Sequence, residues 1–270
     1  MFKRSFAASK DRAGKASKLS KRSFRDDVAK QRLVEMATKS PPVMPTSPIL
    51  TSAIITLVVG KDQRMFAAHE DVLSHSPFFA AACKGAFFEA NAKRIALPDE
   101  QPEVLSAVLE YLYKGDYYPR LLHEKRRNAW TLEDADHPQN GGRGAVEPTV
   151  YHSGWGDTIL RDTAIYCAAE RYGLEELKRL SLRKQGLQSG IDVATILSSA
   201  RFAYANTPDT DSRLRAHYLA LIIRSRKTFK RSGTMQMEME IGGKLFFDLF
   251  VAMCNHIDDV ADITQVPLIL

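Results

Sequence analysis

Hydrophobic and polar positions first form a regular pattern in residues 54–59, Ile-Ile-Thr-Leu-Val-Val. This run of β-branched residues has the length of a strand. A Gly-Lys-Asp turn follows it, and residues 64–68 then fit a second short strand. Residues 94–97, Arg-Ile-Ala-Leu, form a third run that a Pro-Asp pair ends. The pattern therefore predicts three short strands in the first part of the chain.

Two helices are predicted around the third strand. Ser76 can cap free backbone N–H groups, and Pro77 suits the first helical position, where an N–H would be unpaired anyway. A helix is therefore predicted over residues 78–84, and a glycine follows its end. Residues 103–114 carry apolar side chains at helical spacing, which predicts the second helix. This order of strands and helices indicates a mixed α/β domain.

Residues 116–156 interrupt the pattern, because glycines and prolines are frequent there and the centre reads Asn-Gly-Gly-Arg-Gly. A stretch of this length without regular structure predicts a flexible surface insertion. Helices are predicted again over residues 158–172 and 175–184. Three further amphipathic stripes follow: Val193, Ile196, Leu197, Ala200 and Tyr204; Leu214, Tyr218, Leu221 and Ile222; and Phe246, Leu249, Phe250, Met253 and Ile257. The third stripe is interpreted as core.

The net charge of +6 belongs to the N-terminal segment. Residues 1–32 contain eleven Lys and Arg but three Asp, a net charge of +8, and the rest of the chain is close to neutral at −2. Residues 1–27 are rich in Lys, Arg, Ser and Ala, which predicts a disordered arm. The proline-rich stretch that begins at Ser40 predicts an extended linker, so residues 1–47 are expected to be arm and linker.

Composition excludes several classes of protein. The apolar runs are shorter than the roughly 18–20 residues of a membrane-spanning helix, so no membrane partner is expected. The first 25 residues lack the apolar stretch of a secretory signal peptide. Cys83, Cys167 and Cys254 lie far apart without a CxxC pair, which is typical of buried thiols in a reducing compartment.

Four blocks resemble the BTB/POZ domain family. Residues 66–79 (Phe-Ala-Ala-His-Glu-Asp-Val-Leu-Ser-His-Ser-Pro-Phe-Phe) are similar to its signature, and residues 94–99 (Arg-Ile-Ala-Leu-Pro-Asp) to its third strand. Residues 104–115 resemble its leucine-rich helix with Tyr-x-Tyr-x-Gly, and residues 164–177 resemble its closing helices. The blocks occur in family order. The chain looks like the short fungal members of the family.

The resemblance implies an α+β fold, with a small three-stranded sheet flanked by helical hairpins. It implies a BTB/POZ domain over residues 48–181, with the flexible insertion at about 116–156. Residues 182–270 would then form an all-α C-terminal region similar to a BACK-type region. The family implies a non-enzymatic adaptor or scaffold for protein partners, including self-association as a homodimer. In many members an N-terminal helix swaps between subunits, but the candidate helix at residues 28–37 is short and separated from the core by the linker.

Phe87, Phe88 and Glu89 form the candidate partner-binding segment. Members of the family that recruit a cullin scaffold carry a hydrophobic–x–Glu motif in this loop, and Phe87-x-Glu89 is similar to it. An exposed Phe could anchor in an apolar groove while the Glu fixes orientation. The alternative is that both rings pack on their own domain, as Phe usually does. The resemblance thus allows, as a second step, recruitment of a cullin-type ubiquitin ligase.

The basic arm has three interpretations. Its cluster Lys15, Lys18, Lys21 and Arg22 is a candidate nuclear import signal or weak contact to nucleic-acid phosphates. The arm also has the Ser-rich composition of a mitochondrial presequence, although lysine outnumbers arginine in it. The third interpretation is a solvated tail. Nucleus or cytoplasm is the expected location, and nucleic acid is expected to bind only through the arm.

An enzymatic function has little support in the sequence. His69 lies beside two acidic residues, a pattern that general acid–base chemistry can use, but the resemblance gives it a structural role at a strand–helix junction. The glycines at 141–144 lack the strand and the Lys-Ser/Thr of a phosphate-binding loop. No catalytic residue, cofactor or metal is therefore expected. The alternative to an adaptor is a nuclear transcription- or chromatin-associated regulator that uses the arm for nucleic-acid contact.

Overall fold

The computed structural model describes residues 52–84, 93–133 and 147–265. All of them belong to residues 50–270, the second of two units into which the chain divides. The predicted arm and linker at residues 1–47 lie outside the described residues, and so does their boundary with the domain.

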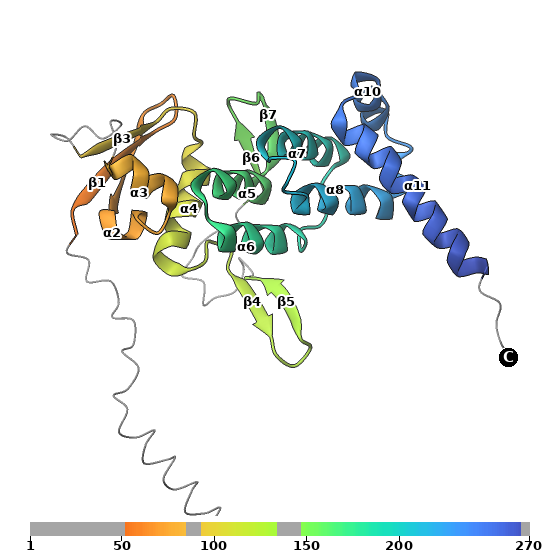
Figure 1. The fold of residues 1–270 in the computed structure, drawn as a ribbon, viewed down its shortest axis with the longest axis horizontal. Helices are drawn as coiled ribbons and strands as arrows, with labels where there is room; N and C mark the ends of the chain where they lie inside the picture. The colour runs from red at the N-terminus through yellow and green to blue at the C-terminus, as the bar shows by residue number, and fades with distance from the viewer. Residues whose placement is uncertain (1–51, 85–92, 134–146, 266–270) are drawn as a thin grey trace, which may run out of the picture. The chain divides into compact units, whose positions relative to one another are not determined.

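A three-stranded sheet begins this unit (Figure 1). Strand β1 (Ile54–Val59) lies at its centre, with β2 (Arg64–His69) antiparallel on one side and β3 (Arg94–Leu97) parallel on the other. Alternate residues of β1, such as Ile55 and Leu57, are fully buried, as expected for a strand with one face against the core. The three strands predicted from the sequence are thereby confirmed.

Short helices connect and cover the sheet. They are α2 (Glu70–Leu73), α3 (Pro77–Lys84) and α4 (Pro102–Lys114). The Ser76 hydroxyl accepts a hydrogen bond from the N–H of the third residue after it, at 3.4 Å, as predicted for a capping serine. Helix α4 ends at Gly115, which adopts the left-handed conformation (φ +73°) that favours glycine at a helix C-terminus. The three strands and the helices α3 and α4 thus fold as their local signals indicate.

Helix α5 (Arg161–Tyr172) lies at the centre of the core, because most of its residues are buried. It contacts α4 and also α6 (Glu175–Gln185), its partner in a helical hairpin. The sequence predicts the start of this helix at residue 158, but residues 157–160 form a strand instead. The extended backbone of Leu160 then marks the start of the helix.

Two hairpins occupy much of the predicted insertion, so the expectation of no regular structure over residues 116–156 is wrong for its described part. Strands β4 (Leu121–Glu124) and β5 (Ala129–Leu132) pair antiparallel, and so do β6 (Thr149–His152) and β7 (Asp157–Leu160). The β4–β5 hairpin contacts helix α6 through Trp130. The Arg183 guanidinium of α6 lies 4.7 Å from the centre of the Trp130 ring, a cation–π contact. Each strand has four residues, too few for a clear alternation.

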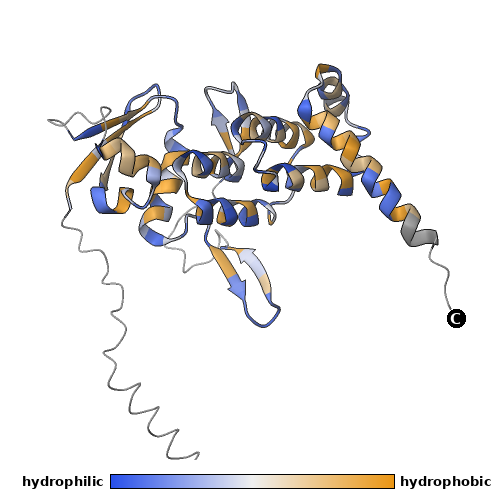
Figure 2. Ribbon diagram, viewed as in Figure 1, coloured by the Kyte–Doolittle hydropathy of each residue, from blue (hydrophilic) through white to orange (hydrophobic). Residues whose placement is uncertain are grey.

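The described residues after position 185 are mostly helical. Its helices are α7 (Val193–Asn206), α8 (Arg213–Arg224), α9 (Arg226–Phe229), α10 (Gly233–Ile241) and α11 (Lys244–Gln265). The stripe on α11 was expected to be core, and this is only half correct. Leu249 is buried and Phe246 is partly buried, whereas Phe250 and Ile257 are 66% and 62% exposed. Figure 2 shows apolar colour over the first part of α11 and alternating polar and apolar colours over its later part.

One continuous core joins these parts. Buried side chains of β1, α4, α5, α7 and α8 belong to a single cluster of contacting apolar residues. The fold is therefore α+β, with a small sheet and helices followed by a helical C-terminal region, as the sequence predicts. None of the described helices is both long enough and apolar enough to cross a membrane.

Candidate interaction surface

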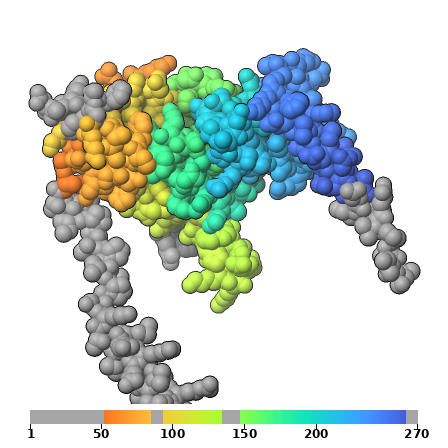
Figure 3. Space-filling model, in the orientation of Figure 1, coloured from red at the N-terminus to blue at the C-terminus, as the bar shows by residue number. Residues whose placement is uncertain are grey.

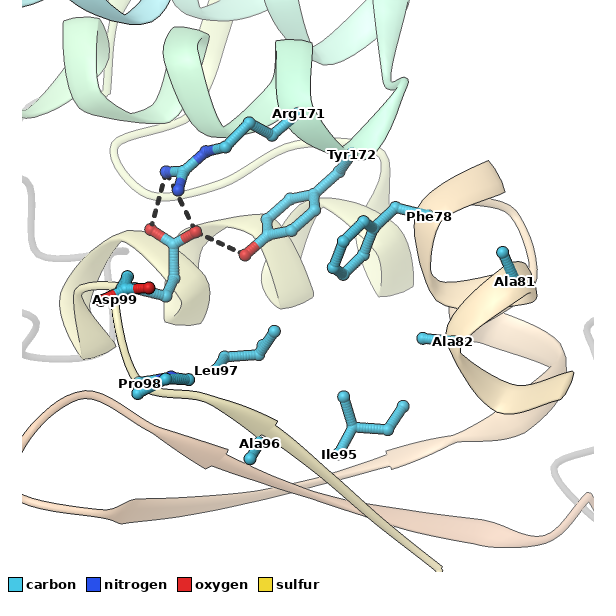
Figure 4. A pocket seen from close by; sticks show the side chains of 11 residues that line it. Phe78, Ala81, Ala82, Ile95, Ala96, Leu97, Pro98, Asp99, Arg171 and Tyr172 are labelled. Atoms are coloured by element: carbon cyan, nitrogen blue, oxygen red, sulfur yellow. Dashed lines mark hydrogen bonds and ion pairs between the residues drawn. The ribbon is translucent and has the colours of Figure 1, made fainter. Parts of the chain in front are cut away.

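An apolar groove of about 600 Å³ lies between α3 and β3, and is named the α3–β3 groove below. Figure 4 shows that Phe78 and Ala82 of α3 face Ile95 of β3 across it. Arg171 and Tyr172, the last residues of α5, close its upper side (Figure 4). Three segments that are far apart in the sequence thus build one concave surface.

Backbone contacts fix α3 against the end of α5. The Ser76 hydroxyl donates a hydrogen bond of 2.7 Å to the carbonyl oxygen of Tyr172. Gly173 follows in the left-handed conformation (φ +69°), and a Cβ at this position would lie 3.2 Å from the ring of Pro77. Only glycine combines this backbone angle with such a close approach. The residues that start α3 therefore also set the distance between the groove's upper side and its α3 wall.

Aromatic rings form one end of the groove. Phe78, Phe79 and Tyr172 pack against one another, with ring centres 4.8–5.2 Å apart. Phe79 is fully buried and belongs to the core, while Phe78 is 40% exposed. A large apolar side chain that keeps this much contact with water beside a groove is suited to pack against a bound partner.

A buried carboxylate holds the polar side of the groove. Glu100, only 4% exposed, accepts hydrogen bonds from the Tyr172 hydroxyl and from the Arg171 guanidinium, the latter at 3.3 Å. The charged groups of Arg171 and Glu100 form an ion pair at 3.2 Å. Burial and then the nearby Glu100 raise the pKa of Tyr172, so its hydroxyl remains a donor at neutral pH. The network is paired internally and positions the two α5 side chains.

The groove suits a peptide segment. Strand β3 ends the sheet order β2-β1-β3, so within the described residues its outer edge has no strand neighbour. An edge of this kind offers backbone N–H and C=O groups to an added strand. Beside it, the apolar lining can accept a side chain, while the partly exposed Arg171 can meet a polar group. The arrangement supports binding of an extended peptide segment.

The structure does not test the site residues predicted from the sequence. Phe87, Phe88 and Glu89 lie outside the described residues, between the end of α3 and the start of β3 in the sequence. The basic cluster of the arm, residues 15–22, also lies outside them. Both remain predictions.

His69 has a structural environment. Its backbone N–H donates to the Tyr113 hydroxyl at 2.9 Å, and its ring Nδ1 lies 2.7 Å from the same oxygen. The Tyr113 hydroxyl has two lone pairs and one proton, so it can donate to Nδ1 in one tautomer of the ring and accept from it in the other. The resemblance implies a structural role for His69, and its backbone and its ring both contact the Tyr113 side chain of α4. His69 thus ties the strand–helix junction to α4.

Sequence reasoning missed the polar side of the groove. Glu100, Arg171 and Tyr172 come together although 71 residues separate the first two, and no local spacing predicts that contact. Phe78 belongs to the signature block, but the sequence does not show that Phe78 is exposed while the adjacent Phe79 is buried. Among the described side chains, no group of three or more His, Cys, Asp or Glu residues could hold a metal ion.

Comparison with known proteins supports the same domain type. Residues 55–129 match the family model described as the BTB/POZ domain. The match runs from β1 to the start of β5 and includes α3, β3 and most of the α3–β3 groove. A search of curated proteins returned no significant match to the chain.

Proposed function

The chain carries a BTB/POZ domain, a module for protein–protein interaction, and we propose that it is a non-enzymatic adaptor that binds a protein partner in the α3–β3 groove. Domains of this type generally serve interaction and not catalysis, and they favour self-association as well as binding to other proteins. The location of the adaptor is proposed to be the nucleus or the cytoplasm.

One observation carries the proposal. The groove is preformed and apolar, and a partly exposed ring, Phe78, stands at its side. Residues in the centre of an interface that are aromatic and packed on one flank contribute much of the binding energy. The rigid attachment of α3 to α5 through Ser76 keeps Phe78 in place, so little ordering is needed on binding.

We further propose that the partner is a cullin-type scaffold, and that Phe87, Phe88 and Glu89 take part. The support is the sequence: the hydrophobic–x–Glu segment directly follows α3, one wall of the groove. An aromatic anchor and a carboxylate would give affinity and orientation, respectively.

The test is binding of the full-length chain to a purified cullin N-terminal domain, measured by biolayer interferometry. We expect Phe87→Ala and Phe78→Ala each to weaken binding by roughly 30-fold, the effect of losing about 2 kcal/mol at a hot spot. Glu89→Ala should weaken it less. Phe247→Ala is the matched control, because Phe247 is an exposed ring outside the matched domain. If the wild type does not bind, or if all variants bind equally well, the proposal of a cullin partner is wrong.

A second candidate function rests on the charge of +8 in residues 1–32. In this alternative the protein is a nuclear regulator, and the arm with Lys15, Lys18, Lys21 and Arg22 supplies salt-dependent phosphate contacts. Deleting residues 1–32 should then abolish DNA binding in a gel-shift assay and nuclear accumulation of a fluorescent fusion together. If the truncated protein still accumulates and binds as the full chain does, this alternative is wrong.

A further inference from the structure

A second groove lies in the C-terminal helical region, outside the matched domain. It has a volume of about 620 Å³, and its lining comes from the end of α8, from α9 and α10, and from one face of α11. Buried Phe229 and Leu249 line it from within, while Phe250 and Ile257 are exposed. This surface is called the α11 groove below.

The length of the α11 groove corresponds to a helix. Its lining residues on α11 run from Phe246 to Val260, about 21 Å at 1.5 Å per residue. This span fits about four helical turns of a partner. Figure 1 shows the later half of α11 extending past α8, and in Figure 3 the dark blue end of the described chain projects from the neighbouring helices. The lining residues Phe250, Met253 and Ile257 are exposed, so the groove is open to solvent.

The lining is adaptable as well as apolar. Met235 and Met239 of α10 and Met253 of α11 all contribute to it. Methionine is flexible and polarisable, and grooves lined with it accept apolar side chains of different shapes. An amphipathic helix placed in an apolar groove, with anchors at helical spacing, is a common mode of peptide recognition.

The charged residues in the lining of the groove have one sign. Arg226 and Lys230 are the charged residues among its described lining. They belong to a cluster of five exposed bases: Arg224, Arg226, Lys227, Lys230 and Arg231. No ion pair within the described part of the chain includes any of these five bases.

Acidic residues near the groove do not neutralise this cluster. Glu238 of α10 is paired with Arg201 at 3.1 Å. Asp258 and Asp259 are exposed on α11 but do not line the groove. From Ser212 to Met237 the sequence contains no Asp or Glu. The wall formed by α9 is therefore positive.

We propose that the α11 groove binds an acidic amphipathic helix of a protein partner. Its apolar side chains would enter the groove beside Phe250 and Ile257, and its carboxylates would meet Arg226 and Lys230. A concave surface of helical length favours a helix over a flat bilayer, although bases and exposed rings also occur on membrane-binding surfaces. This inference uses residues outside the BTB/POZ match and stands independently of the proposed adaptor function.

The test uses the full-length chain and two synthetic fluorescent peptides of 18 residues. Both carry Leu and Phe at helical spacing; one has Glu and the other Lys on the opposite face. Fluorescence anisotropy should show that the Glu peptide binds at least tenfold more tightly. The double variant Arg226→Glu/Lys230→Glu should reverse this preference. Lys125→Glu/Arg126→Glu is the matched control, because it makes the same charge change in the exposed β4–β5 turn.

A second pair of variants tests the groove itself. Phe250 and Phe247 are exposed to nearly the same extent, 66% and 67%, but only Phe250 lines the groove. We expect Phe250→Ala to weaken binding of the Glu peptide at least tenfold and Phe247→Ala to change it less than twofold. Circular dichroism should show equal helix content for both. Equal effects on binding would overturn the proposal.

Two other occupants are distinguishable. Sequence positions 244–265 of α11 themselves carry one Lys and four Asp, so a second copy of the chain is a competitor. If light scattering shows a dimer that Phe250→Ala dissociates, and the Glu peptide does not bind, the occupant is a second copy and the proposal fails. If vesicles of phosphatidylcholine with 30% phosphatidylserine bind and the Glu peptide does not displace them, the surface is a membrane contact and the proposal fails.

Discussion

Single residues explain how the α3–β3 groove keeps its form. Glu100 is buried, and Tyr172 and Arg171 satisfy its carboxylate from α5. A buried carboxylate without hydrogen-bond partners would lower the stability of the fold by more than its hydrogen bonds contribute to it. The sequence could not predict this network, because its members come from distant segments and each is common in its own context.

The glycine between α5 and α6 provides a prediction at this scale. Gly173→Ala should lower the free energy of unfolding by about 1–2 kcal/mol for the left-handed backbone, and by roughly 1 kcal/mol more for contact with Pro77. Gly115→Ala is the control, since Gly115 has φ +73° but no neighbour within 4 Å of an added Cβ. Urea unfolding measures both. An equal loss in the two variants would contradict the steric contribution of Pro77.

At the scale of elements, strong local signals were read correctly. The β-branched run predicted β1, and the Ser-Pro start predicted α3. The β4–β5 and β6–β7 hairpins were missed because their strands are short and lie among glycines and prolines. The stripe of α11 was assigned to the core because periodicity shows that a helix has an apolar face, but does not show whether the chain covers that face.

Helix α7 offers a prediction with a pH dependence. Asp192 caps it: its carboxylate accepts from the Thr195 N–H at 2.9 Å and from the Thr195 hydroxyl at 2.7 Å. The Thr195 side chain and then its backbone lower the pKa of Asp192. We expect Asp192→Ala to cost about 1 kcal/mol at neutral pH, the usual value for a lost cap.

The sign of the pH effect follows from the lowered pKa. The stabilisation by ionised Asp192 is present above its unfolded pKa, near 3.9, and is lost as the pH falls through the lower folded value. Asp192→Asn keeps a hydrogen-bond acceptor but cannot ionise. The difference in free energy of unfolding between this variant and the wild type should therefore become smaller as the pH falls from about 5 to about 3. Urea unfolding of both proteins over this pH range measures the difference. A difference that does not change with pH would show that the charge contributes nothing.

At the scale of the molecule, the matched residues 55–129 share a core with α5 and α6, the helices that follow the match. Tyr117, inside the match, is fully buried, and its hydroxyl donates to Asp162 of α5 at 2.7 Å. Lys184 of α6, 1% exposed, donates to the carbonyl oxygen of Pro119 at 2.8 Å. The segment that follows α4 is therefore held by helices that come after the match.

A fragment of residues 50–133 should accordingly fail to fold. It would expose the apolar residues that α5 covers and leave Tyr117 without its partner. We expect no cooperative thermal transition in circular dichroism for this fragment, against a cooperative transition for residues 50–265. A cooperative melt of the shorter fragment would show that the matched domain is independent of the helices.

Two of the three thiols, Cys83 and Cys254, can report on the accessibility of the helices that carry them. Cys167 is fully buried, and burial raises its pKa to about 12. Alkylating reagents should therefore not react with it in the native state. Cys83 lies on α3 and Cys254 on α11, both partly accessible. Partial burial and Glu70 raise the pKa of Cys83. Labelling of Cys83 and of Cys254 would thus report separately on the accessibility of α3 and of α11, without introducing any new residue.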